Sequence, residues 1–459
     1  MKRTHPITDV IIESLSDNTF SFDCTSILLT QQTDKEPIIQ YSGPGSISKG
    51  DSEDFTIKLY SNVPAHLRTQ PIRFSGDIAE SYIPGQIIHS SEYFKMEAVA
   101  YNGEIWTAEN IWLSGNVNYN THGMILSGLT GCITLAAKCN RTHYIFDMTC
   151  LHQDFRFPCN SFTEDSSGRT RNKSEFEIDT TKCVLTTLKN TLNIQLISET
   201  PFPNHFDRAF LNALQISTGK QLKLIHKRAA TPTESVVTLN AELNTSPFSS
   251  LYCTLPNCNR PWGLSTSSEF IAKLLPKLIN EETPHFLQYF MDMFTAYRSG
   301  IEASALGFSV AVEGMASHYF KKLGKSDPIF VEKCLAAIPI INNAESDGLI
   351  ETNVRDKLLA SLKGAAASSP KNTLYKLFDK KVTDQWVKIR HPAAHGSLLD
   401  KNLTPQELVN CTHTCLYMFY AMLSAHIDYK GQIINYSIPE HATVDNEVFK
   451  NIKAIESRV

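Results

Sequence analysis

A chain of 459 residues is too long for one hydrophobic core of ordinary size, so we expect two or three domains. Hydrophobic residues at 42% and charged residues at 20% are typical of a globular protein and exclude a largely disordered one. The formal net charge of −4 excludes a broadly basic nucleic-acid coat, so any contact with nucleic acid must come from a local patch.

Cysteine content and hydropathy indicate the compartment. The chain holds eleven cysteines, an odd number, and its N-terminus lacks the apolar run of a signal peptide. The best candidate for a membrane span, residues 303–316, is shorter than the ~20 apolar residues required and is interrupted by Glu313. We therefore expect a cytoplasmic protein with free thiols and no membrane contact.

The first half of the chain has the pattern of β-strands. Short runs rich in β-branched and aromatic residues alternate there with Gly, Pro, Asn and Asp. The predicted strands are residues 19–29, 54–60, 94–101, 105–113, 132–137, 143–147, 175–179, 192–197 and 222–226. Asn102-Gly103 separates two of them and predicts a hairpin turn that needs a positive φ. We predict a mainly antiparallel sandwich or open barrel over residues 1–245.

Two groups of cysteines are weighed as zinc ligands. The first consists of Cys132, Cys139, Cys150 and Cys159, with His143 and His152 between them. Its spacings are longer than the Cys-x2–4-Cys pairs of structural zinc sites, so buried thiols are the preferred interpretation. Cys253 and Cys258 lie in a predicted linker, residues 246–264, and no second pair follows them nearby. They stay weak zinc candidates, with loop cysteines as the alternative, and we predict no metal and no cofactor.

From residue 265 to 459 the apolar period becomes that of helices, which predicts an all-α bundle. Helices are expected over residues 270–279, 284–298, 301–323, 327–341, 351–362 and 372–389. A further helix begins after Thr404 and runs to about residue 430. Its start, Thr404-Pro405-Gln406-Glu407, has Thr at the N-cap, Pro at the first helical position and Glu at the third, which is a capping box.

The richest chemical motif lies at residues 388–396, Lys-Ile-Arg-His-Pro-Ala-Ala-His-Gly. The Arg390 guanidinium can hold the non-bridging oxygens of a phosphodiester, and it stays charged at any working pH. His391 and His395 titrate near neutrality and can exchange protons with a 2′-hydroxyl or a leaving 5′-oxygen. Pro392 disfavours helix at the residue before it, so we expect the chain to bend out of the helix there.

Other charged residues would support this motif. Glu313 lies within an apolar helix, eleven residues after Glu302 and on nearly the same face, and it needs a cationic partner. Arg390 is a candidate for that partner, but a solvated glutamate at the rim is the preferred interpretation. Residues 371–390 carry five lysines and one arginine against two aspartates, a balance of +4. Lys380, Lys381 and Lys388 are therefore candidate RNA contacts, although such a run also fits a solvated helix face.

The arrangement Arg-His-x-x-x-His between helices resembles the Arg-x4–6-His motif of the HEPN superfamily, many of whose members are metal-independent endoribonucleases. A helical module of this kind behind a β-rich domain resembles the ApeA-type anti-phage proteins in particular. The resemblance implies that His395 is the catalytic histidine, Arg390 the catalytic arginine and His391 the polar residue after it. It also implies a homodimer or higher homo-oligomer in which two motifs face each other.

These observations lead to one functional hypothesis and two alternatives. We expect an endoribonuclease of abortive infection, with tRNA among the candidate substrates, whose β-rich domain restrains the helical domain until a phage-derived trigger appears. His395 would deprotonate the 2′-hydroxyl, Arg390 would neutralise the phosphate, and a 2′,3′-cyclic phosphate would result. One alternative is an inactive HEPN-like module that binds RNA or a partner protein and dimerises. The other is a sensor whose β-rich half does the recognition.

Overall fold

The computed structural model of the chain describes residues 6–34, 38–51, 53–61, 87–113, 118–120, 123–165, 168–241, 248, 250–258, 260–281, 283–325, 327–394, 403–438 and 440–456. The chain divides into two compact units. The first unit comprises Met1–Phe155, Cys159–Phe202 and Gln221–Phe248, and the second comprises Arg156–Pro158, Pro203–Lys220 and Ser249–Val459. The second unit therefore takes Pro203–Lys220 from within the segment that was predicted to be β-rich.

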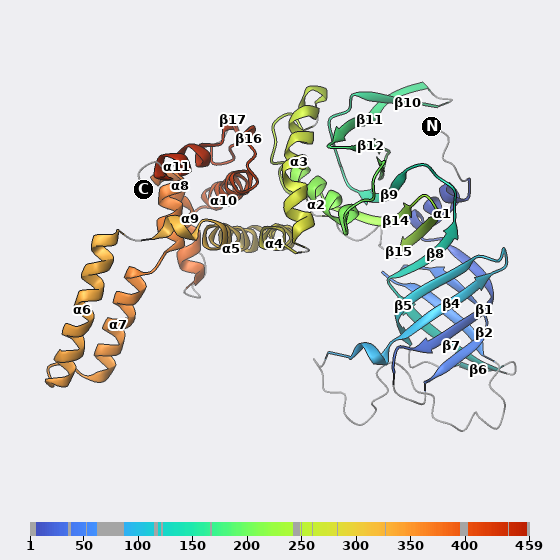
Figure 1. The fold of residues 1–459 in the computed structure, drawn as a ribbon, viewed down its shortest axis with the longest axis horizontal. Helices are drawn as coiled ribbons and strands as arrows, with labels where there is room; N and C mark the ends of the chain where they lie inside the picture. Colours follow the sequence, from blue (N-terminus) through green and yellow to red (C-terminus); the bar gives the residue numbers. More distant parts are fainter. Residues whose placement is uncertain are drawn as a thin grey trace. The chain divides into compact units, whose positions relative to one another are not determined.

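The first unit is built on one antiparallel sheet (Figure 1). Its strands are β1 (Ser21–Gln31), β2 (Gln40–Lys49), β3 (Phe55–Ser61), β4 (Phe94–Ala100), β5 (Ile105–Leu113), β6 (Asn118–Asn120), β7 (Gly123–Thr130), β8 (Cys132–Lys138), β9 (Tyr144–His152), β10 (Ser161–Asp165), β11 (Gly168–Ile178), β12 (Thr181–Thr187), β13 (Thr191–Ser198), β14 (Leu222–Ala230) and β15 (Glu234–Asn240). The hydrogen-bonded order is β10-β11-β12-β13-β9-β14-β15-β8-β5-β4-β1-β2-β3-β7-β6. The predicted antiparallel β character of this half is confirmed.

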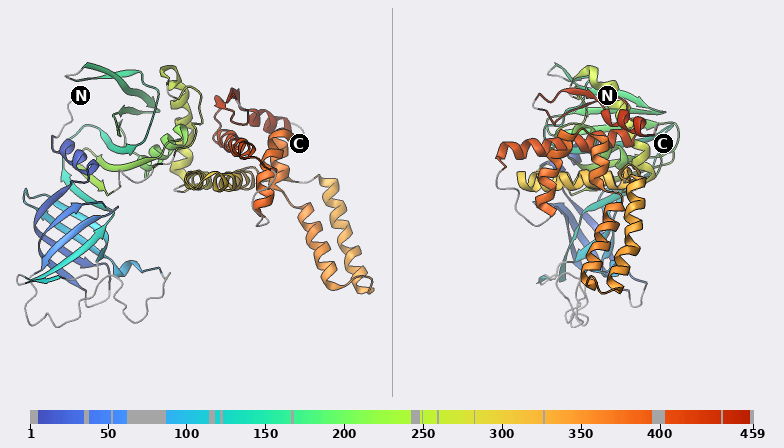
Figure 2. Two further views of the ribbon diagram at one scale, coloured as in Figure 1. Left: turned by 180° about the vertical axis from the view of Figure 1, so that it is seen from behind. Right: turned by 90° about the vertical axis from the view of Figure 1, so that its left-hand side faces the viewer.

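Six of these strands close into a barrel in the order β5-β4-β1-β2-β3-β7 (Figure 2). Closure comes from β7, which pairs with β3 along its length and also with the end of β5, where Trp112 is opposite Leu129. The remaining strands continue the sheet beyond β5, starting with β8. The barrel is therefore closed, and neither an open barrel nor a sandwich describes it.

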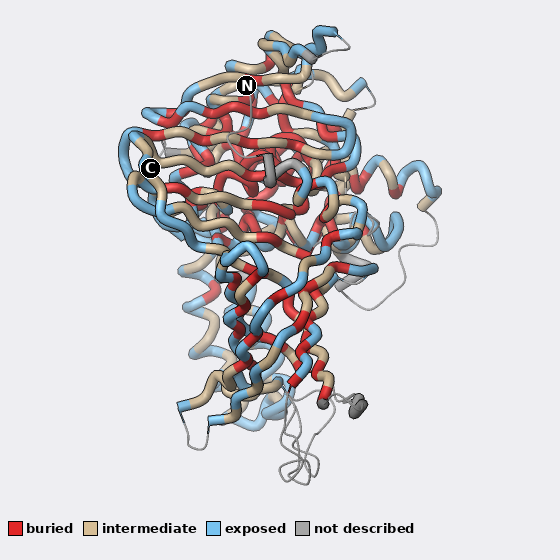
Figure 3. Tube along the Cα trace, turned by 90° about the vertical axis from the view of Figure 1, so that its right-hand side faces the viewer, coloured by how far each residue is buried: buried red, intermediate tan, exposed pale blue. Residues whose placement is uncertain are grey.

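Side-chain alternation fills the barrel. Buried and more exposed residues alternate along the strands of the barrel (Figure 3). Along β3, Phe55, Ile57 and Leu59 are fully buried, and the residues between them are not. This period of two is the property of a strand with one face in a core and one in solvent. The predicted hairpin between β4 and β5 is confirmed, because Gly103 has a φ of +85° and its N–H donates to the Ala100 carbonyl at 2.9 Å.

Several strands are not among those predicted from the sequence: β2, β6, β7, β10, β12 and β15. Strand β2 carries Gly43-Pro44-Gly45, which is a turn signal in most contexts. Its proline is tolerated because it lies at a β-bulge, where the register of β1 against β2 shifts between Cys24 and Ile27. The helices α1 (Pro6–Ser16) and α2 (Phe206–Thr218) were also not predicted.

The second unit consists of helices and one short hairpin. Its helices are α2, α3 (Leu264–Asn280), α4 (His285–Arg298), α5 (Ile301–Tyr319), α6 (Pro328–Ser346), α7 (Thr352–Ala366), α8 (Pro370–Leu377), α9 (Lys380–Ala394), α10 (Pro405–His426) and α11 (Glu447–Glu456), and its strands are β16 (Gln432–Ile434) and β17 (Thr443–Asp445). Helix α10 is buried over most of its circumference and packs against α5 and α9. The predicted capping box is confirmed, since Thr404 Oγ1 accepts from the Glu407 N–H and the Glu407 carboxylate accepts from the Thr404 N–H. Among the described residues, no helix is both long and apolar enough to cross a membrane.

Two predictions about the segment before the motif are wrong. Residues 372–389 do not form one helix, because α8 ends at Leu377 and α9 begins at Lys380. Asp379 causes the restart, since its side chain accepts from the Val382 N–H at 3.0 Å as an N-cap does. The expected bend at Pro392 is absent, and α9 continues to Ala394. A proline in the last turn of a helix removes one backbone hydrogen bond, and this disrupts little because almost none of the helix follows it.

The closeness of β2 and β3 gives a prediction on stability. A Cβ at Gly45 would lie 2.1 Å from the Lys58 carbonyl oxygen, which is backbone and has little freedom to move. Gly45→Ala should therefore lower the free energy of unfolding by ~1–3 kcal/mol, the usual effect of overpacking. Gly131→Ala is the matched control, because nothing lies within 4 Å of its Cβ position. Equal denaturant midpoints for the two variants would contradict this barrel geometry.

Candidate functional site

Helix α9 is held on α5 by a buried tryptophan. Trp386 is almost fully buried, and its indole N–H donates to the Ser309 carbonyl on α5 at 2.9 Å. Ile389 faces the same core and is fully buried. Because an indole N–H needs a partner when it is buried, this bond fixes both the rotation of α9 and its position along α5.

Arg390 and Glu313 meet one helical turn beyond this contact. Arg390 comes four residues after Trp386 on α9, and Glu313 comes four residues after Ser309 on α5. Each helix has advanced by about one turn, so the Arg390–Glu313 pair lies one turn beyond the contact between Trp386 and Ser309. The Arg390 Nε donates to Glu313 Oε2 in an ion pair. From the sequence, this pairing was only the alternative to a solvated glutamate. The two side chains retain 23% and 33% of their exposure, so the pair is half-buried and solvent still reaches it.

The ion pair leaves much of the guanidinium available. Within the part of the chain that the structure describes, the Nη atoms of Arg390 have no hydrogen-bond partner, since the contact with Glu313 uses Nε. A guanidinium held at one edge still presents N–H groups that match two oxygens of a phosphate. The arrangement can therefore bind a phosphodiester with a cation that is already oriented.

The structure does not describe the side chains of the two histidines of the motif. His391 belongs to the last turn of α9, and its side chain lies outside the described set. His395 falls within residues 395–402, which are outside the described residues, so its assignment as the base stays a prediction.

The three lysines do not gather around Arg390. Lys388 precedes Arg390 by two residues, about 200° of helix rotation, so the two side chains leave opposite sides of α9. Lys388 instead contributes to the lowered pKa of Glu407, whose main cause is the hydrogen bond from the Thr404 N–H. Lys381 shares the side of Lys388, and Lys380 starts the helix almost three turns away. All three lysines are exposed and fit a solvated face.

Cys253 and Cys258 form a thiol pair. Cys253 Sγ lies 3.9 Å from the Tyr436 hydroxyl, and that hydroxyl donates to the Cys253 carbonyl at 2.6 Å. The hydrogen bond from Cys258 lowers the pKa of Cys253 to about 7. A structural zinc site needs four ligands, and among the described residues no group of three or more His, Cys, Asp or Glu could hold a metal ion.

The other cysteines of the helical unit and of the first cysteine group are packing residues. Cys411 and Cys415 are buried on α10, whereas the His413 ring packs edge-on to Tyr252 at 4.9 Å. His413 therefore does not share the face of the two cysteines. Cys150 is fully buried, and its burial raises the pKa of its thiol.

One polar cluster was not found from the sequence. The rings of His285 on α4 and His318 on α5 stack at 4.1 Å, and the Tyr289 hydroxyl lies 2.8 Å from His318 Nδ1. His285 and Tyr289 are four residues apart on one helix, which is the spacing that would have marked them. His318, five residues after Glu313, leaves another side of α5, so this cluster is separate from the ion pair.

Comparison of the chain with protein-family models, with curated proteins and with solved structures finds no match. The geometry around Arg390 therefore has to support a function by itself.

The thiol pair gives a prediction on reactivity. Because the hydrogen bond from Cys258 lowers the pKa of Cys253 below that of an ordinary thiol, a larger share of Cys253 is thiolate at pH 7 and its alkylation should be faster. Cys258→Ala removes the hydrogen bond, and the rate at Cys253 should then fall at pH 7 but stay unchanged near pH 9.5. The rate is followed by mass spectrometry of the Cys253 peptide with iodoacetamide. Equal rates at pH 7 in the parent and the variant would show that Cys258 does not tune Cys253.

Proposed function

We propose that the helical unit is a metal-independent endoribonuclease with Arg390 at its active site. The observation that carries the proposal is the guanidinium held at Nε by Glu313, which solvent still reaches and whose Nη atoms have no hydrogen-bond partner among the described residues. A fixed cation of this kind stabilises the negative charge that develops on a phosphate in the transition state. Oriented in advance, it needs no rearrangement when the substrate binds.

The proton transfers fall to histidine. His395 takes the proton of the 2′-hydroxyl, the 2′-oxygen attacks the phosphorus, and the bond to the 5′-oxygen breaks. The leaving 5′-oxygen receives a proton from a second acid, for which the imidazole of His391 or of a histidine of a second copy is suited. The products are a 2′,3′-cyclic phosphate and a 5′-hydroxyl, and no other reactant is needed.

The surface beside the ion pair supports a second copy at this site. Leu306 and Val310 precede Glu313 on α5 by seven and three residues, so the three share one face of the helix. Both apolar side chains are exposed on that face. A second copy packed against them would exclude water from two apolar residues and bring a second arginine and a second motif close to the first.

A binding module without catalysis is the second candidate. The same ion pair fits an arginine that only joins α9 to α5, because a half-buried carboxylate and guanidinium satisfy each other. In that case the helical unit binds RNA or a partner protein, and Arg390 contributes to the packing of the two helices.

Substitution of Arg390 separates the two candidates. Arg390→Ala should reduce cleavage of purified RNA by at least ~10²-fold, the scale of one lost transition-state donor. Lys388→Ala is the matched control, since it removes a cation from the opposite side of the same helix and should leave cleavage unchanged. EDTA should change neither rate. Cleavage by Arg390→Ala at the parent rate, or loss of the parent's activity in EDTA, would refute the proposal.

The cellular role that we propose is anti-phage defence. An enzyme that destroys host RNA must be restrained, so we infer that the β-rich unit holds the helical unit inactive until a phage product binds. The same two variants test this role in infected cells, where Arg390→Ala should lose protection and Lys388→Ala should retain it. Equal protection by both would assign defence to another part of the chain.

A further inference from the structure

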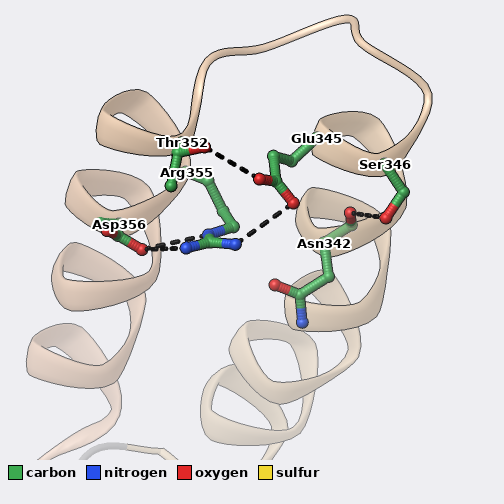
Figure 4. Close-up of polar contacts among 6 residues, drawn as sticks. All are labelled: Asn342, Glu345, Ser346, Thr352, Arg355 and Asp356. Carbon is green, nitrogen blue, oxygen red and sulfur yellow. Dashed lines mark hydrogen bonds and ion pairs between the residues drawn. The ribbon is translucent and has the colours of Figure 1, made fainter.

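Helices α6 and α7 form a hairpin that projects from the rest of the second unit (Figures 1 and 2). The two helices pack chiefly against each other. Polar contacts fasten the tip (Figure 4): the Arg355 guanidinium reaches Asp356 at 2.7 Å and Glu345 at 3.2 Å, and the Thr352 hydroxyl donates to Glu345 at 3.0 Å. The hairpin is therefore a defined element with a fixed pairing of its helices.

This hairpin has almost no core of its own. Of its described side chains, only Cys334 is buried. Seven large apolar side chains of the hairpin are exposed: Ile329, Phe330, Leu335, Ile340, Leu349, Val354 and Leu358. A helix with apolar residues on all sides is normally buried in a larger structure. Two helices that meet along one narrow seam do not bury enough surface to be stable alone.

Part of the exposed apolar surface lies on one flank. Buried Cys334 on α6 and half-buried Leu359 and Leu362 on α7 mark the sides by which the two helices touch. Given these contact sides, helical spacing in an antiparallel pair puts four exposed side chains on a common flank of the hairpin. They are Phe330, Ile340, Val354 and Leu358.

The area of this flank is that of a sizeable exposed patch. Its four side chains are between 42% and 68% exposed, which leaves several hundred Å² of apolar area in water and reaches the ~300–600 Å² of the largest patch on a typical monomer. The matching flank of a second hairpin would cover it.

The charges of the hairpin complement those of a second copy turned end for end. Residues 345–356, at the tip, hold four acidic residues and one arginine, a net charge of −3. Residues 321–333, at the base, hold four lysines and two acidic residues, a net charge of +2. When two hairpins lie antiparallel, each acidic tip meets the basic base of the other, whereas a parallel pair would bring like charges together.

We propose that the α6–α7 hairpin is a self-association element, and that hairpins of two copies pack antiparallel through the flank of Phe330, Ile340, Val354 and Leu358. The contact is isologous, so it closes on two copies and buries the same patch on both. It is separate from the α5 face beside Arg390 and does not depend on RNA cleavage. The base of each hairpin, next to the 3-10 helix η4 (Lys321–Gly324), then lies beside the tip of its partner.

Apolar-to-charged substitutions on the flank test the contact. Ile340→Glu with Leu358→Glu places two desolvated charges in the proposed interface, while in a single copy both positions face water and the fold is unaffected. The mass in analytical ultracentrifugation should fall to half that of the parent. Val10→Glu on α1 is the matched control, because Val10 is 66% exposed against 68% for Ile340, and it should keep the parent mass. A parent that sediments as a single copy, or a hairpin variant with the parent mass, would overturn the proposal.

Charge reversal tests the antiparallel orientation. One variant reverses the tip, with Asp347→Lys and Glu351→Lys, and the other reverses the base, with Lys325→Glu and Lys333→Glu. When either variant pairs with a second copy of itself, like charges meet at both ends of the contact. Each variant alone should therefore sediment at half the parent mass. Mixed together, they present opposite charges at both ends and should recover the parent mass as a heteromeric pair. If mixing restores nothing, hairpins of two copies do not pair end for end.

Discussion

The register of α9 against α5 is set by two contacts one turn apart, and the candidate site depends on it. The buried Trp386 N–H has its partner in the Ser309 carbonyl, and an unpaired N–H there would cost ~1–3 kcal/mol. That bond carries Arg390 to Glu313 at the next turn. The guanidinium is thus positioned by the core of the helical unit, and a phosphate that reaches it meets a cation whose place is already fixed.

Sequence patterns predicted what local chemistry decides. The strand at residues 54–60, the positive φ at Gly103 and the capping box at Thr404 each depend on a few neighbouring residues, and all three are confirmed. The sequence also offered Glu313 as a candidate partner of Arg390, because a glutamate in an apolar helix needs a nearby cation. It did not favour that pairing over a solvated glutamate, so the motif and the cap could be obtained without a structure and the pairing could not.

Other features depend on distant residues and had no local signal. Closure of the barrel rests on the pairing of β7 with β5, and the proline of β2 is tolerated only because a bulge in β1 lies opposite. Pro392 predicted a bend, yet the packing of Trp386 and Ile389 on α5 holds α9 helical to its last turn. The apolar sequence of α6 predicts burial, and only the structure shows its side chains in water.

Metal-independent attack by a 2′-hydroxyl is tested most directly by the ends of the cleaved RNA. The parent protein, incubated with RNA in EDTA, should leave a 2′,3′-cyclic phosphate on the upstream fragment and a 5′-hydroxyl on the downstream one. The cyclic phosphate is identified by mass spectrometry, and the 5′-hydroxyl accepts phosphate from a polynucleotide kinase without prior dephosphorylation. Fragments that end in a 3′-hydroxyl and a 5′-phosphate would contradict the mechanism, because water and not the 2′-oxygen would then be the nucleophile.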